Sequence, residues 1–180
     1  MAVCSRLTPM SSTQTESPVE RFVTSLEELD VTWTRTDADA VESTVAELLD
    51  EPAVGIPIPI DGASLPSAVD TDPDPAAVRA AATGVTPATL GIADYGSVLL
   101  PSDDHGSGLL SLFPETHIPV VSERDVVGTM ADAFGELGPQ LRDDRGDVII
   151  ATGPSATSDM GEIVRGVHGP TDVHVVIVEQ

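Results

Sequence analysis

Lysine is absent from this chain of 180 residues, and its eight basic residues are all arginines. Thirty aspartates and glutamates outnumber them, which gives a formal net charge of −22. Nucleic acids and anionic membrane surfaces bind proteins through clustered cations, and this chain has few cations to cluster. The composition therefore disfavours both partners. It favours a strongly solvated, halophilic type of surface, suited to a salt-rich cytoplasm that screens self-repulsion.

Cysteine is nearly absent as well, since Cys4 is the only one. A single thiolate cannot form an intrachain disulfide, and it cannot by itself hold an iron–sulfur cluster or a structural zinc ion. Asp103, Asp104 and His105 are adjacent in one loop, but three consecutive residues rarely converge on one metal ion. We therefore expect a solvated acidic loop there, and neither a metal nor a cofactor in this chain.

Long apolar runs are also missing. No segment approaches the roughly 18 to 20 apolar residues that a membrane-spanning helix needs, and the opening MAVCSRLTPM lacks the apolar core of a signal peptide. The sequence therefore predicts a cytoplasmic protein. Residues 1–17 are aperiodic and rich in serine and threonine, which indicates a disordered tail, with Met1 or Met10 as the true start. Residues 18–180 are predicted to form a single domain.

The rest of the chain is an alternation of helical and strand-like segments. Apolar residues at helical spacing predict helices that begin at Pro18 and after Asp37 and that cover 75–84, 109–113, 127–137 and 160–167. Strand-like runs cover 31–36, 53–60, 88–102 with an interruption at 94–96, 117–122, 147–152 and 172–180. Prolines inside 53–60 predict a sheet edge or an early end. The alternation predicts an α/β fold with a mostly parallel sheet and helices on both faces. In it, 148–152 and 173–178 are predicted to be buried strands.

One segment, ATGPSATSDMGEIVRGVHGP at 151–170, has the composition of a ligand-binding turn. A strand is predicted to run into it and a short helix to begin within it, so that unpaired N–H groups of the helix face the turn. Gly153 permits close backbone approach. The candidate hydroxyl donors are Thr152, Ser155, Thr157 and Ser158. We therefore predict a site for a small oxyanion or carboxylate, with a plain helix cap at Ser155 or Ser158 as the alternative. The segment is neither a P-loop nor a dinucleotide fingerprint.

Three stretches carry a family resemblance. TGPSATSDMGEIVRGVHGPTDVHVVIV at 152–178 resembles the carboxy-terminal signature of the lactate utilisation (LUD) domain family, in particular its protein C-like members. LGIADYGSVLL at 90–100 and GSGLLSLFPETHIPVV at 106–121 resemble the other half of that pattern. The resemblance implies a fold like the NagB, RpiA and CoA-transferase group. It also implies a role in oxidising L-lactate to pyruvate beside iron–sulfur partner proteins, with lactate or a related carboxylate or phosphate as ligand.

The chain departs from the family pattern at one place. Where the family reads Ala-Glu-Thr-Gly, this sequence has Ala93 followed by Asp94, Tyr95 and Gly96. The resemblance implies that these three residues form the wall that faces the turn at 152–158. The alternative is that Asp94 is an ordinary turn aspartate. His168 matches the family motif, and the alternatives are that it faces the pocket or that it only hydrogen-bonds the turn.

Two other histidines open strand-like runs. His117 and His174 each stand at or near the start of such a run, and both are predicted to be half-buried structural residues.

Two classes of function follow from these observations. In the first, the chain is a cluster-free subunit or accessory protein of a lactate-oxidising system. In the second, it is a stand-alone enzyme of the isomerase or CoA-transferase type that uses Asp94 on a phosphorylated or thioester substrate. The absence of lysine weighs against the second class, because sugar-phosphate and CoA sites usually recruit several cations.

The net charge supports a prediction about salt. We expect the melting temperature to be higher in about 1 M KCl than in about 50 mM KCl, because screening relieves a repulsion that folding intensifies. Thermal melts at the two salt concentrations measure the effect. A melting temperature that stays flat or falls with added KCl would contradict the prediction.

Overall fold

The computed structural model describes residues 17–102, 106–144, 147–159 and 162–180. The predicted tail up to residue 16, the choice between two start sites, and the acidic loop at 103–105 lie outside the described residues. Residue 17, the last residue of the predicted tail, is part of the cap of the first helix instead. Ser17 caps the first helix in a reciprocal capping box, in which its hydroxyl accepts from the Glu20 N–H and the Glu20 carboxylate accepts from the Ser17 N–H.

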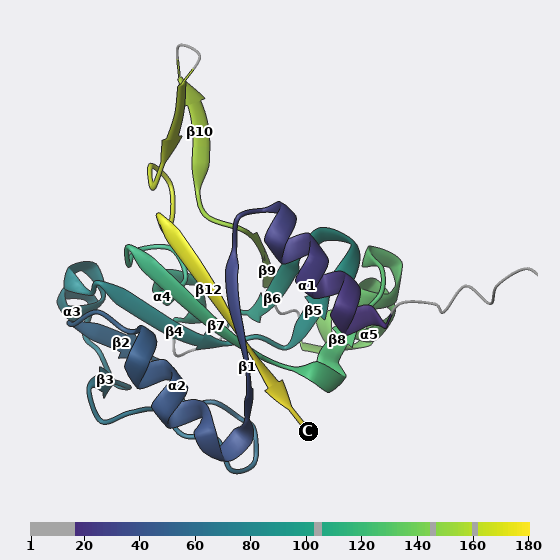
Figure 1. Ribbon diagram of the computed structural model, residues 1–180, viewed down its shortest axis with the longest axis horizontal. Coiled ribbons are helices and arrows are strands. Elements are labelled where there is room, and N and C mark those ends of the chain that lie inside the picture. The colour runs from purple at the N-terminus through teal and green to yellow at the C-terminus, as the bar shows by residue number, and fades with distance from the viewer. Residues whose placement is uncertain (1–16, 103–105, 145–146, 160–161) are drawn as a thin grey trace, which may run out of the picture.

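A parallel sheet of six strands forms the centre of the molecule (Figure 1). In spatial order the strands are β1 (Thr32–Asp37), β12 (Asp172–Glu179), β7 (Thr116–Ser122), β4 (Thr83–Pro87), β2 (Ala53–Gly55) and β3 (Val69–Asp70). Every neighbouring pair in this sheet is parallel. The predicted mostly parallel α/β fold is confirmed, and β2 ends before Pro57, as the prolines in its segment indicated.

Helices cover both faces of this sheet, as predicted. The helices are α1 (Pro18–Glu28), α2 (Val41–Leu48), α3 (Pro75–Ala80), α4 (Ser107–Leu110) and α5 (Met130–Asp144), with short 3₁₀ turns η1 (Ala38–Ala40), η2 (Ala93–Tyr95) and η3 (Glu123–Asp125). Alternate residues of β12 point to opposite faces. Val175 and Ile177 pack in one core cluster with Phe22 of α1, whereas Val176 packs with Val45 of α2 in another.

A second sheet of four strands packs on the α1 side. Its order is β8 (Val126–Val127), β5 (Leu90–Ile92), β6 (Ser97–Pro101) and β9 (Val148–Thr152). The pairs β5–β6 and β6–β9 are antiparallel. The prediction that 148–152 is a strand is therefore confirmed, but the prediction that it is buried is wrong. β9 is an edge strand of this smaller sheet, and Ile150 is 40% exposed. The predicted buried strand at 173–178 lies inside β12, which is central and mostly buried.

Three predicted helices have different limits in the structure. The helix expected over 109–113 is α4, which begins at Ser107 and ends at Leu110. The helix expected over 75–84 ends at Ala80, and Gly84 lies inside β4 rather than at a helix end. The helix expected over 127–137 begins at Met130 and continues through Pro139 to Asp144. Its core-facing residues are Ala133 and Leu137, and Phe134 is 56% exposed. Apolar spacing alone did not show which of these side chains would be buried.

The helix predicted over 160–167 is wrong. The described residues there form an antiparallel hairpin of β10 (Ala156–Asp159) and β11 (Glu162–Arg165), which projects away from both sheets (Figure 1). Val164 is 41% exposed and Val167 is 50% exposed, so neither of these two apolar residues belongs to a buried face. Several residues of the hairpin are β-branched, and such residues favour strands over helices.

Candidate functional site

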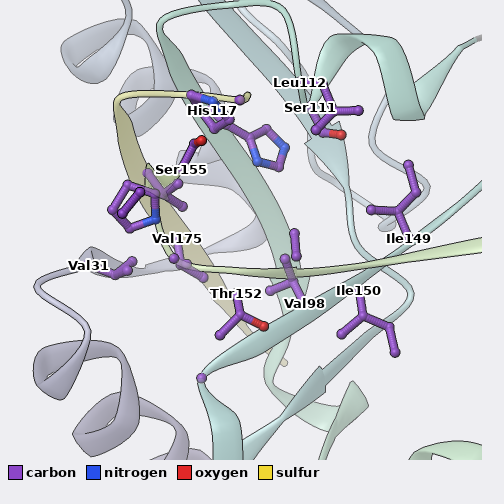
Figure 2. Close-up of a pocket in the computed structure, with 18 of the residues that line it drawn as sticks. Val31, Val98, Ser111, Leu112, His117, Ile149, Ile150, Thr152, Ser155 and Val175 are labelled. Carbon is purple, nitrogen blue, oxygen red and sulfur yellow. The ribbon is translucent and has the colours of Figure 1, made fainter. Parts of the chain in front are cut away.

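A cavity of about 480 Å³ lies at the base of the projecting hairpin (Figure 2). We call it the hairpin-base cavity. Its walls come from α1, β6, β9, β12 and the segments that enter and leave the hairpin. Most of the lining is apolar, as in Val31, Val98 and Val175. A volume of this size is typical of sites for small organic molecules.

Six of the nine predicted site residues line this cavity. They are Thr152, Gly153, Ser155, Thr157, Gly96 and His168. The pairing of β6 with β9 brings them together, because Ser97 lies opposite Thr152 in the antiparallel register. Their two hydroxyl oxygens are 2.6 Å apart and share a hydrogen bond. Residues more than fifty positions apart in the sequence therefore meet at one wall.

The base of the hairpin is held together by Ser155. Its backbone N–H donates to the Pro170 carbonyl at 2.8 Å, and its carbonyl accepts from the Gly166 N–H at 2.9 Å. The Ser155 hydroxyl accepts from the His168 N–H at 3.2 Å. Gly153 just before it has φ of +62°, a conformation that favours glycine. The turn is thus a rigid corner that closes one side of the cavity.

The other three predicted residues are not among those that line the cavity. Asp94 forms an ion pair with Arg21 of α1, and the same guanidinium donates to the Gly128 carbonyl at 3.0 Å. Tyr95 is 52% exposed, and neither it nor Asp94 lines the cavity. Ser158 lies in β10 opposite Ile163, and its side chain is outside the described part. Of the predicted facing wall, only Gly96 contributes to the cavity.

The predicted anion site lacks its main physical support. No helix begins at the 152–158 turn, because β10 starts there instead, so no helical N–H groups face the cavity. None of the described residues that line the cavity is an arginine. The Thr152 hydroxyl is paired with Ser97, whereas the Ser155 hydroxyl accepts from the His168 N–H and can still donate its own proton. A small oxyanion at this turn therefore stays a prediction that rests on a few side chains.

His117 is the polar residue of the cavity that sequence reasoning missed. The side chain was expected to be half-buried, but it is 1% exposed, and its ring points into the cavity (Figure 2). Its Nε2 is 2.8 Å from the hydroxyl oxygen of Thr86 on the neighbouring strand. Burial lowers the pKa of His117 to about 3, so the ring is neutral near pH 7. One signal was available: His117 belongs to the apolar run HIPVV, and a histidine in a strand buried on both faces needs a polar partner.

His174 behaves as predicted. It is partly buried, and its two ring nitrogens are 2.8 Å and 2.9 Å from the hydroxyl oxygens of Thr32 and Thr34 on β1. Burial also lowers its pKa. Because both nitrogens are occupied by the edge strand, His174 is a structural residue of the sheet.

A second cavity, of about 600 Å³, opens at the carboxyl ends of β2, β4 and β7. Ligands of open parallel sheets commonly bind at that edge. Its lining is rich in proline and aliphatic side chains, and its charged lining residues are Asp125 and Glu136. Burial, with a smaller contribution from Glu136, raises the pKa of Asp125. No sequence motif pointed to this cavity.

The described ranges provide no group of three or more His, Cys, Asp or Glu residues that could hold a metal ion. Within the same ranges, the helices fall short of the length and apolar character that a membrane crossing requires.

Comparison with known proteins places these observations in a family. The family model of the LUD domain matches residues 19–178. Lactate utilization protein C of Deinococcus radiodurans is 36% identical over 97 residues, which cover 52% of this chain and 45% of that protein. The protein of the same name from Bacillus licheniformis is 34% identical over 102 residues, covering 53% of this chain and 42% of that protein. The matched regions are therefore less than half the length of these curated relatives.

A solved structure shares the fold. The crystal structure of a DUF162 family protein from Deinococcus radiodurans superimposes with a TM-score of 0.67 over 94% of this chain and 99% of that one. The two sequences are 21% identical, so the likeness supports the arrangement of strands and helices and nothing finer.

Proposed function

The chain belongs to the LUD domain family, and from this premise we propose that it is a component of a system that oxidises L-lactate to pyruvate. The observation that carries the proposal is the match of the family model across 19–178, together with relatives named lactate utilization protein C. In this role the chain acts with iron–sulfur partner proteins.

The chemistry of the reaction supports a division of labour. Oxidation of a 2-hydroxy acid to a 2-keto acid removes two electrons and two protons, and the electrons need an acceptor. With Cys4 as its only cysteine, this chain has too few thiolates to ligate an iron–sulfur cluster. Clusters in such a system would therefore be held by partner proteins.

The geometry gives little support to the alternative of a stand-alone isomerase or CoA-transferase. Asp94, the carboxylate that such an enzyme would use, is engaged by Arg21 and lies outside the hairpin-base cavity. The described lining of that cavity contains no lysine or arginine to hold a phosphate or CoA. A role as one subunit of a larger oxidising system is the better fit.

Reconstitution tests this proposal. We expect the tagged chain, drawn from native lysate in concentrated KCl, to bring down cysteine-rich iron–sulfur proteins. The captured mixture should reduce an electron-accepting dye when L-lactate is added. The pure chain alone should not reduce the dye, depletion of the chain should abolish the activity, and adding it back should restore the activity. Lactate oxidation by the pure chain, or an active mixture that survives its depletion, would contradict the proposal.

A further inference from the structure

We infer that the hairpin-base cavity binds a neutral, largely apolar molecule that carries one hydrogen-bonding group, and that His117 is the polar anchor for that group. This inference does not depend on the proposed function. It rests on the composition of the cavity wall and on one unsatisfied nitrogen atom.

The wall of the cavity is apolar on several sides. The aliphatic side chains of Val31, Val98, Ile149, Val173 and Val175 line the cavity from four different segments, the last two from β12. None of the described lining residues is Asp, Glu, Lys or Arg. A charged ligand would lose its hydration there without gaining a counter-charge, which is costly. A neutral ligand with an apolar body avoids this cost and gains from burying its surface.

His117 provides an unused hydrogen-bonding atom in this apolar setting. Its Nε2 is bonded to Thr86, whereas Nδ1 has no hydrogen bond among the described residues. Every fully shielded side-chain nitrogen or oxygen in the described part has a partner. The free nitrogen is therefore not fully shielded, and the ring that carries it lines the cavity (Figure 2). Buried polar groups are normally paired, so an unpaired one that faces a cavity points to a ligand.

The charge state of the His117 ring determines which ligand group it can bind. Because burial keeps the imidazole uncharged near pH 7, Nδ1 offers one neutral donor or acceptor, according to the direction of the bond with Thr86. A hydroxyl or a carbonyl oxygen suits such a partner, whereas a carboxylate would need a cation. Among nearby hydroxyls, those of Ser111 and Thr152 already bond within the protein. The Ser155 hydroxyl accepts from the His168 N–H and can still donate its proton, so the variants of His117 decide which group anchors the ligand.

A matched series of three bicyclic probes tests the inference. Naphthalene has no polar group, 2-naphthol adds a neutral hydroxyl, and 2-naphthoate adds a carboxylate. Affinities are measured by fluorescence or calorimetric titration in about 1 M KCl, which screens the net charge. We expect 2-naphthol to bind most tightly, naphthalene less tightly and 2-naphthoate least tightly. The advantage of 2-naphthol over naphthalene should be about 2-fold to 10-fold, as expected for one neutral hydrogen bond.

Two variants assign this advantage to His117. In His117→Phe, and in the double variant Thr86→Val with His117→Phe, 2-naphthol should bind no better than naphthalene. The double variant removes both partners of the internal hydrogen bond, so it guards against misfolding from an orphaned hydroxyl. Phe134→Ser, which removes an exposed aromatic ring on α5, should leave the whole order unchanged.

Three results would overturn the inference. The first is failure of naphthalene and 2-naphthol to bind the folded wild type. The second is tighter binding of 2-naphthoate, lactate, pyruvate or phosphate than of the neutral probes, which would restore the oxyanion site. The third is a 2-naphthol advantage that the folded double variant retains, which would place the anchor at another residue.

Discussion

Replacing Gly84 with alanine is expected to lower the free energy of unfolding by about 3 kcal/mol, at the upper end of what an added methyl group costs in a packed interior. A Cβ atom at this position would lie 2.1 Å from the backbone oxygen of Leu110 and 2.9 Å from the ring of Pro114. The strand cannot move aside easily, because β4 is hydrogen-bonded to β2 on one side and to β7 on the other. The added methyl group must therefore displace the backbone of α4.

Gly135→Ala is the matched control for this substitution. Gly135 lies inside α5, and a Cβ there would meet no atom within 4 Å. Alanine is the better helix former, so this variant should gain about 0.5 to 1 kcal/mol. Denaturant unfolding of the three proteins in the same KCl concentration measures both changes. Equal stability of Gly84→Ala and the wild type would show that the β4–α4 contact is looser than the structure indicates.

Acidification from about pH 7 to about pH 5 is expected to cost the protein about 2 kcal/mol of stability through His117 alone. The folded pKa is about 3, against an ordinary value of 6.5. Below about pH 6.5 the unfolded chain therefore binds a proton on His117 that the folded protein does not bind. The free energy of unfolding therefore falls as the pH drops from about 6.5 to about 3. At neutral pH this loss has not begun. The cause is burial of the ring, which disfavours its charged form.

The double variant Thr86→Val with His117→Phe isolates this effect. It keeps every carboxylate and His174, whose pKa is also lowered by burial, so these groups contribute equally to both proteins. Unfolding free energies at several pH values should show the wild type losing about 2 kcal/mol more than the variant by about pH 5. Parallel pH profiles for the two proteins would mean that His117 becomes protonated in the folded state.

Several features could be determined from the sequence by itself. The segments at 117–122 and 173–178 are apolar at nearly every position, and only a strand covered on both faces buries such a run, so the parallel sheet followed directly. Pro18 at a helix start predicted α1, and local hydrogen bonds at Ser17 complete that start. The family was likewise indicated by motifs in the sequence, and the family model confirms it. These features depend on neighbouring residues or on complete burial.

Other features were decided only by the tertiary structure. Apolar residues are spaced like a helix over 160–167, yet Glu162–Arg165 form strand β11, because that spacing predicts a helix only when one face is packed against a partner. The edge position of β9 depends on its pairing with β6, about fifty residues away. The role of His117 depends on Thr86 and on cavity walls from several distant segments. Contacts between remote residues select among local alternatives of similar free energy, and they are not encoded in any one stretch of the chain.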